Sequence, residues 1–140
     1  MKSQTSNQSS TQRISKKDYY LGIAEAVSKR SPCIKMKVGS ILVKEDSIIS
    51  TGYNGVARGV EHCVVCNRLD KESGSEYITC PAIHSEENSI INAARQGVST
   101  IDSVLYLWTD VGGLKPCYRC ERAIRNAGIK KVIINDKRNV

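Results

Sequence analysis

The sequence predicts a single α/β domain built around a mixed sheet. Three observations indicate this fold class. The chain has 140 residues, which suits one domain and is too short for two that each bury a core. Two β-branched segments separated by a short turn predict an antiparallel hairpin. After the hairpin, helical and strand patterns alternate, which predicts neighbouring strands joined by a right-handed crossover.

The first expected element is a helix over residues 15–30. Tyr19, Ile23 and Val27 recur at helical spacing, and Ser15 is a suitable N-cap. The hairpin follows, with strands over 38–44 and 47–53 on either side of the turn-forming pair Glu45 and Asp46. Next comes a long irregular segment over 54–83 that contains three of the six cysteines. A loop this long in a compact domain indicates a functional role.

The remaining elements have clear end signals. A helix is expected over 85–96 with Gly97 as its stop, and another over 118–127 with Gly128 as its stop. Strands are expected over 104–108 and 131–135, which are rich in β-branched and aliphatic residues. The order is therefore helix, two strands, loop, helix, strand, helix, strand.

Residues 1–14 are mostly polar and are expected to form a disordered tail, so the single domain is assigned to 15–140. The formal charge of +7 comes from the basic N-terminal tail and the basic C-terminal quarter, and it suits a phosphate-bearing partner. The chain has neither an apolar run of about 20 residues nor a signal peptide, which predicts a cytoplasmic protein without membrane contact. Its six cysteines are then reduced thiols, for which metal binding is the first expectation.

Two short motifs predict the chemistry. His84 and Glu86 open one expected helix, while Cys117 and Cys120 open another after Pro116. His84 and the two thiolates, which share one helical face, supply three ligands for zinc and leave a fourth position for water, as in catalytic rather than structural sites. Glu86 can then carry protons between that water and a substrate.

Each motif alone has a simpler explanation. A lone C-x-x-C is more often a structural zinc site or a redox pair, and a lone H-x-E carries no information. Together and in this order they form the H-x-E…P-C-x-x-C signature of zinc-dependent nucleobase deaminases. The catalytic interpretation is therefore preferred.

The whole chain from the first helix to the last strand resembles the deoxycytidylate (dCMP) deaminase family. Besides the zinc motif, the resemblance includes KVGSILVKED at 37–46, STGYNG at 50–55, RGVEHC at 58–63 and NAGIKKVI at 126–133. It implies a three-layer α-β-α cytidine deaminase-like fold with a mixed central sheet of four to five strands. It also implies hydrolysis of dCMP to dUMP and ammonia, which supplies the precursor of dTMP, by a homo-oligomer under control by dCTP and dTTP.

Five residues are expected to contact the substrate. The resemblance places Asn54 at the nucleotide, although an asparagine here could also serve only the turn. Backbone near Ser85 and the turn around Tyr118 are expected to hold the base. Arg30 and Arg58, together with Lys35, are the candidates for the phosphate, although each could equally be a solvated surface residue.

The four other cysteines predict a second, structural zinc. Cys63 and Cys66 have zinc-ligand spacing within the long loop, and Cys33 and Cys80 complete a set of four, with His62 as an alternative ligand. Buried free thiols are the simpler alternative. The resembled family often carries such a second zinc, and Cys33 and Cys63 fall where two of its ligands lie.

Some features depart from the family pattern. The segment TDVGGLK at 109–115, expected to roof the base, is longer than usual, and this difference bears on base selectivity rather than on zinc catalysis. Residues after 135 are few, so the fifth strand of the family is expected to be short or missing, and the exposed sheet edge to need a subunit partner.

Two alternatives to dCMP deamination remain open. The first is a deaminase acting on dCTP, on free cytidine nucleosides, or on cytosine or adenine in nucleic acid. The second is a non-catalytic, zinc-stapled binding module. The absence of Phe and the single Trp leave few stacking platforms for a nucleic acid, and an intact Glu86 argues against a purely structural site.

Overall fold

The computed structural model describes residues 12–72, 75 and 77–138, and its helices and strands follow the predicted order. The elements are α2 (Lys16–Ser28), β1 (Val38–Lys44), β2 (Ser47–Tyr53), the short 3-10 helix η1 (Tyr77–Thr79), α3 (Ser85–Gln96), β3 (Val104–Thr109), α4 (Tyr118–Asn126) and β4 (Lys131–Ile134). Most of the tail predicted over residues 1–14 lies outside the described residues.

The four described strands form one mixed sheet in the order β2-β1-β3-β4. β1 pairs antiparallel with both β2 and β3, while β3 and β4 are parallel and joined through α4. The hairpin turn lies at the predicted pair, and both Glu45 and Asp46 have positive φ, as a tight two-residue hairpin turn requires. The described part of the chain contains no fifth strand.

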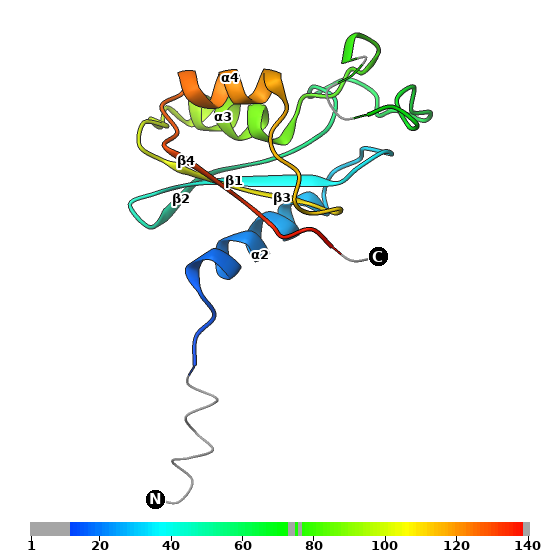
Figure 1. Ribbon diagram of the computed structural model, residues 1–140. Helices are drawn as coiled ribbons and strands as arrows, with labels where there is room; N and C mark the ends of the chain where they lie inside the picture. The colour runs from blue at the N-terminus through cyan, green and yellow to red at the C-terminus, as the bar shows by residue number, and fades with distance from the viewer. Residues whose placement is uncertain (1–11, 73–74, 76, 139–140) are drawn as a thin grey trace, which may run out of the picture.

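The helices cover both faces of the sheet, so the expected three-layer α-β-α architecture is confirmed (Figure 1). α2 packs on one face through a cluster that includes Tyr20, Leu21 and Ile41. α3 and α4 pack on the other face through a cluster that includes Leu105, Leu107 and Ile124. None of the described helices is long and apolar enough to cross a bilayer.

The described residues between β2 and α3 are irregular apart from η1, as predicted. A bridge between Gly55 and Ile83 closes it at its base, with backbone N–H···O distances of 3.1 and 2.8 Å. The chain between these two residues therefore leaves and re-enters the domain at one place, beside the start of α3. It projects from one end of the sheet in Figure 1.

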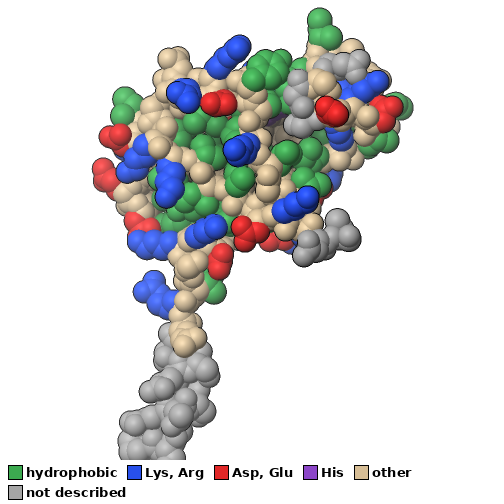
Figure 2. Space-filling view, viewed as in Figure 1, with side chains coloured by type: hydrophobic (Ala, Val, Ile, Leu, Met, Phe, Trp, Pro, Cys, Tyr) green, Lys and Arg blue, Asp and Glu red, His purple; other side chains and the backbone are tan. Residues whose placement is uncertain are grey.

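The basic residues do not form one continuous patch on the face shown in Figure 2. Lys and Arg side chains are spread over this face and alternate with Asp and Glu. Such a distribution does not resemble the basic stripe that tracks a nucleic-acid backbone.

Candidate active site

The N-termini of α3 and α4 converge and bring together the three predicted metal ligands. His84 is the N-cap of α3, Cys117 is the N-cap of α4, and Cys120 lies in the first turn of α4. The ligand atoms of the three residues all lie within 4.8 Å of one another. The His84 Nδ1 atom lies 3.4 Å from Cys117 Sγ and 3.3 Å from Cys120 Sγ.

This geometry fits a zinc ion. Tetrahedral zinc with ordinary bond lengths separates a nitrogen ligand from a sulfur ligand by about 3.6 Å, close to the observed distances. Burial, with a smaller effect from Arg119, lowers the pKa of His84 to about 4, so its ring is neutral and can coordinate. Burial also raises the pKa of the Cys120 thiol, so the metal must displace its proton on binding.

A layer of serines holds the start of α3 against the sheet. The Ser40 hydroxyl donates to the Ser85 carbonyl oxygen at 2.9 Å, and the Ser85 hydroxyl donates to the Gly52 carbonyl oxygen at 3.1 Å. A Cβ atom on Gly52 would lie only 2.5 Å from the Ser85 carbonyl oxygen and even closer to the Ser89 nitrogen. Glycine at position 52 therefore permits the close approach of α3, and with it the position of His84.

A second connection ties the two helix starts together. One carboxylate oxygen of Glu87 accepts from the His84 backbone N–H and from the Arg119 guanidinium, both at 2.9 Å. This capping contact satisfies an otherwise free N–H at the start of α3. Since Arg119 lies between the two cysteines in α4, the ion pair links both ligand-bearing helices.

Glu86 lies beside the ligands but is not one of the clustered groups. It is 5% exposed, and burial raises the pKa of its carboxyl group above the usual range. A carboxyl group with a raised pKa can both accept and release a proton near neutral pH.

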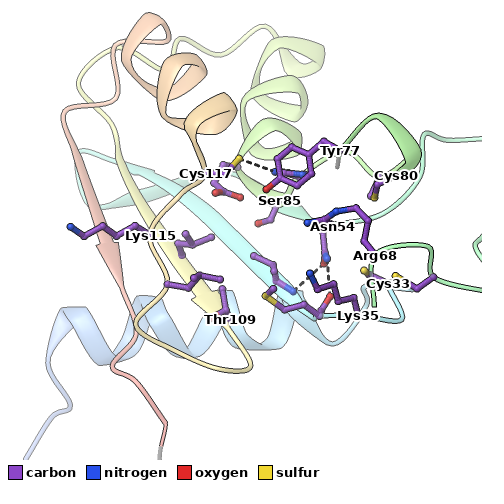
Figure 3. A pocket seen from close by; sticks show the side chains of 18 residues that line it. Cys33, Lys35, Asn54, Arg68, Tyr77, Cys80, Ser85, Thr109, Lys115 and Cys117 are labelled. Atoms are coloured by element: carbon purple, nitrogen blue, oxygen red, sulfur yellow. Dashed lines mark hydrogen bonds between the residues drawn. The ribbon is translucent and has the colours of Figure 1, made fainter. Parts of the chain in front are cut away.

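These groups open into one cavity (Figure 3). His84, Glu86 and Cys117 line one part of it, and Leu114 and Lys115 of the segment over 109–115 line another. The long loop over 54–83 also contributes to the lining, through Asn54, Cys66, Arg68, Tyr77, Cys80 and Ala82. The loop is therefore part of the site.

Asn54 lines the cavity, but its side chain is largely engaged within the protein. Its Oδ1 atom accepts from the Ser31 hydroxyl at 2.5 Å and from the Val38 backbone N–H at 3.0 Å. Its Nδ2 atom donates to the Met36 carbonyl oxygen at 2.8 Å. One N–H remains for a ligand. Its φ is not positive, so a left-handed turn does not explain this residue.

The other predicted substrate contacts are divided between the cavity and the surface. Ser85 and Lys35 line the cavity. Tyr118 is about half exposed, and its ring stacks on that of Tyr77 with centroids 6.1 Å apart. Arg30 is exposed and does not line the cavity, and Arg58 lies in a separate groove where it donates to Asn92 at 2.9 Å.

Tyr77 and Arg68 were not singled out from the sequence. The Tyr77 ring meets the His84 ring edge-on with centroids 4.7 Å apart, and the guanidinium groups of Arg68 and Arg119 lie 4.5 and 5.1 Å from its centroid. Arg68 lies in an irregular part of the loop and Tyr77 begins the short helix η1, and the sequence of neither segment shows a helical or strand period. Only the aromatic residue seven positions before His84 could have drawn attention to this segment.

The four remaining cysteines are free and are not clustered as a metal group among the described residues. Three of them, Cys33, Cys66 and Cys80, line the same cavity, whereas Cys63 is exposed. His62 is exposed as well. The structure therefore supports one predicted zinc site and does not assemble the second.

Comparisons with known proteins agree with this site. Residues 14–136 match the model of the "cytidine and deoxycytidylate deaminase zinc-binding region". The chain is 36% identical over 126 residues to a deoxycytidylate deaminase of Schizosaccharomyces pombe, covering 87% of this chain but 37% of that protein. It is 34% identical over 125 residues to the deoxycytidylate deaminase of Mycobacterium phage D29, covering 83% of this chain and 91% of the phage protein.

The chain thus spans just over a third of the fission yeast relative and nearly all of the phage relative. A solved structure of dCMP deaminase from the cyanophage S-TIM5, in complex with dCMP and dUMP, matches with a TM-score of 0.68 and 30% identity. The match covers 86% of this chain and 82% of the cyanophage chain.

Proposed function

The chain belongs to the family of cytidine and deoxycytidylate deaminases, and from this premise we propose that it catalyses hydrolysis of dCMP to dUMP and ammonia. The observation that carries the proposal is the convergence of His84, Cys117 and Cys120 at a cavity that a buried carboxyl group, Glu86, also lines. Two relatives named deoxycytidylate deaminase, and a cyanophage dCMP deaminase with dCMP and dUMP bound, support dCMP as the substrate.

In this proposal His84 Nδ1 and the thiolates of Cys117 and Cys120 hold one zinc ion. Zinc in such a three-ligand site supplies a hydroxide nucleophile at neutral pH. The charges balance, since one divalent ion neutralises two thiolates while His84 stays neutral.

Glu86 moves the protons. Its carboxylate accepts a proton from the attacking water, and its carboxyl group then delivers a proton to N3 of the pyrimidine, which makes C4 electrophilic. It then takes the proton of the hydroxyl group now bonded to C4 and delivers it to the amino nitrogen, which leaves as ammonia while the C4 carbonyl forms. The remaining N–H of Asn54 and backbone near Ser85 orient the nucleotide. Tyr118 stacks on Tyr77, which lines the cavity, and supports the position of that ring.

The test is an ultraviolet assay that offers dCMP, dCTP, CMP, deoxycytidine and a short cytosine-containing single strand in parallel. We expect the highest kcat/KM with dCMP. Turnover confined to dCTP, to a nucleoside or to the oligonucleotide would identify another deaminase. If zinc-loaded protein turns over none of these substrates, the remaining interpretation is the non-catalytic binding module.

We also propose a second, structural zinc held by Cys33, Cys63, Cys66 and Cys80, with His62 as an alternative to Cys66 or Cys80. Three of these cysteines, Cys33, Cys66 and Cys80, line one cavity, which supports the proposal. Metal analysis of protein purified without chelator should return two zinc ions per chain. A value of one would remove the second site.

The assembly and its control are proposed on the family resemblance. We expect a homo-oligomer, which would cover the free edge of β4, and control by dCTP and dTTP. Light scattering after size exclusion would measure the first, and dCMP turnover with each triphosphate the second. A cytoplasmic location is proposed because six free cysteines suit a reducing compartment.

A further inference from the structure

Arg68 is a buried cation at the cavity that the proposed mechanism does not use. Although it comes from the long irregular loop, it is only 8% exposed. It lines the same cavity as His84 and Glu86, and Figure 3 shows its guanidinium group reaching in between Tyr77 and Asn54. Arginine is rarely buried to this extent without a charged partner.

The described residues provide Arg68 with dipoles but with no carboxylate. Its Nε atom donates to the Ser75 carbonyl oxygen at 2.7 Å, and its Nη2 atom donates to the Glu72 carbonyl oxygen at 3.0 Å. Its guanidinium carbon lies 4.5 Å from the centroid of the Tyr77 ring. These contacts orient the group and leave its charge without a counter-ion in the described chain. A buried charge is costly unless it is paired, so the site favours an anion.

The ring of Tyr77 connects the metal ligand His84 to Arg68 along the lining of one cavity. The ring of Tyr77 contacts both the His84 ring and the Arg68 guanidinium, so one aromatic side chain separates the reacting end of the cavity from Arg68. A base that lies at His84 and Glu86 would direct its sugar, and then its phosphate, along Tyr77 toward Arg68.

The other cations are less suited to this task. Lys115 also lines the cavity but is exposed, and Figure 3 shows its side chain extending away from the other labelled residues. Lys35 lies on the same side as Arg68, but its amino group already donates to the Lys71 carbonyl oxygen. Only arginine presents a fixed fork of donors that matches phosphate oxygens.

We propose that Arg68 binds the 5′-phosphate of the deoxynucleotide and thereby selects the monophosphate over the nucleoside. This inference rests on the proposed deaminase function. It replaces Arg30 and Arg58, which were expected from charge alone, with a residue at the cavity. Phosphate binding would also tie the long loop to the site, since Glu72, Ser75 and Tyr77 all contact Arg68.

The test compares dCMP with deoxycytidine in the wild-type protein and in Arg68→Gln. Loss of a charged hydrogen-bonding partner should lower kcat/KM for dCMP by about 10- to 100-fold. The value for deoxycytidine, which lacks the phosphate, should stay unchanged. An equal fall for both substrates would assign Arg68 to loop structure alone, and an unchanged dCMP value would also overturn the proposal.

Three further measurements make the test decisive. Arg125→Gln, which alters a surface arginine of α4 with an 81% exposed side chain, should change neither value. Arg68→Lys keeps the positive charge but lacks the paired N–H donors of the guanidinium group, and it should retain part of the preference for dCMP. It replaces Arg68→Gln in the comparison if that variant does not fold. Calorimetry with dUMP and deoxyuridine measures phosphate recognition without turnover. If the wild-type protein deaminates none of the substrates, the proposed function fails. The phosphate site is then still supported if Arg68→Lys binds dUMP more weakly than the wild-type protein does and binds deoxyuridine with the same affinity.

Discussion

Glu86 and Glu87 are neighbours in α3 with opposite environments. Glu86 is buried and faces the cavity without a basic side chain bonded to it among the described residues. Glu87 accepts from the His84 backbone and from Arg119. The first carboxyl group is suited to proton transfer, whereas the second bonds to the starts of two helices and holds them in place.

Replacing Glu86 with glutamine should abolish proton transfer while keeping the shape of the side chain. We expect kcat to fall by about 100- to 10,000-fold, the usual contribution of a general acid–base group. Zinc content, measured by elemental analysis, should stay at the wild-type value because Glu86 is not a ligand. Near-normal turnover by Glu86→Gln would refute the proton-carrier role. Glu121→Gln, a change on the exposed surface of α4, serves as the control.

Replacing Glu87 with alanine should loosen the metal site without removing a ligand. It removes the capping contact to His84 and the partly buried ion pair to Arg119, which together contribute about 1–2 kcal/mol. We expect a lower free energy of unfolding in urea and faster release of zinc to a colorimetric chelator. Glu121→Ala breaks only the exposed pair with Arg125, at 3.5 Å, and should change neither quantity. Equal zinc release by the two variants would contradict the positioning role of Glu87.

At the scale of the elements, local signals decided which predictions succeeded. The hairpin and α3 have the predicted bounds, because a positive-φ turn at Glu45 and Asp46 and a left-handed Gly97 at the helix end are local features. The first helix ends at Ser28 rather than Arg30, since helix ends depend on capping that periodicity does not register.

In the candidate site, too, the features tied to local sequence signals could be predicted. The convergence of His84, Cys117 and Cys120 could be predicted because their spacing is tied to two helix starts. The contribution of Tyr77 and Arg68 could not, because the path of a loop depends on contacts between distant residues. Arg30 and Arg58 were chosen by charge alone, which does not determine whether a side chain faces the cavity.

The contact between α3 and β2 should not tolerate a side chain at position 52. In Gly52→Ala the new methyl group would collide with backbone atoms of α3 at Ser85 and Ser89. Because these are backbone atoms, the collision cannot be relieved by a change of side-chain rotamer. We expect a loss of about 1–3 kcal/mol in the free energy of unfolding, as for other overpacked cores, and lower activity because His84 moves with α3. The matched control is Gly22→Ala in the exposed face of α2, where no atom lies within 4 Å. That change should stabilise the protein by about 0.5–1 kcal/mol. A stable, fully active Gly52→Ala protein would contradict the close packing of α3.

The contact between α2 and the hairpin turn should depend on pH. The Tyr20 hydroxyl donates to the Asp46 carboxylate at 2.6 Å. This bond raises the pKa of Tyr20 to about 12 and lowers the pKa of Asp46. The stabilisation is therefore complete above about pH 4, the ordinary value for Asp, and is lost as the pH falls through the lowered pKa of Asp46. On the alkaline side it is complete below about pH 10 and is lost as the pH rises through the raised pKa of Tyr20.

Comparing the wild-type protein with Tyr20→Phe isolates this pair from other titrations. We expect the variant to be less stable toward urea at pH 7, and the difference to shrink at pH 3. Tyr19→Phe alters an exposed neighbouring ring and should leave stability unchanged at both values. A difference that stayed constant between pH 7 and pH 3 would show that Asp46 does not supply the stabilisation.

At the scale of the whole molecule, zinc and the apolar core stabilise different parts of the fold. One cluster, around Tyr20 and Ile41, contains no metal ligand, whereas the other includes Cys120 with Leu105 and Leu107. The sheet and α2 can therefore stay folded when the metal is removed. The neighbouring starts of α3 and α4 hold all three proposed ligands, so they should lose the most stability.

Removing zinc with a chelator should therefore lower stability without unfolding the protein at room temperature. Free zinc at a thousand times its Kd stabilises the native state by about 4 kcal/mol. At roughly 3–5 °C per kcal/mol for a domain of this size, the melting temperature should fall by about 10–20 °C. Activity should vanish, the far-ultraviolet circular dichroism should persist, and added zinc should restore both activity and melting temperature. In Cys117→Ser, which lacks a ligand, the chelator should have a smaller effect. Loss of the far-ultraviolet signal on chelation would mean that the metal is required for the fold itself, because the apolar clusters would then be too weak to hold the sheet.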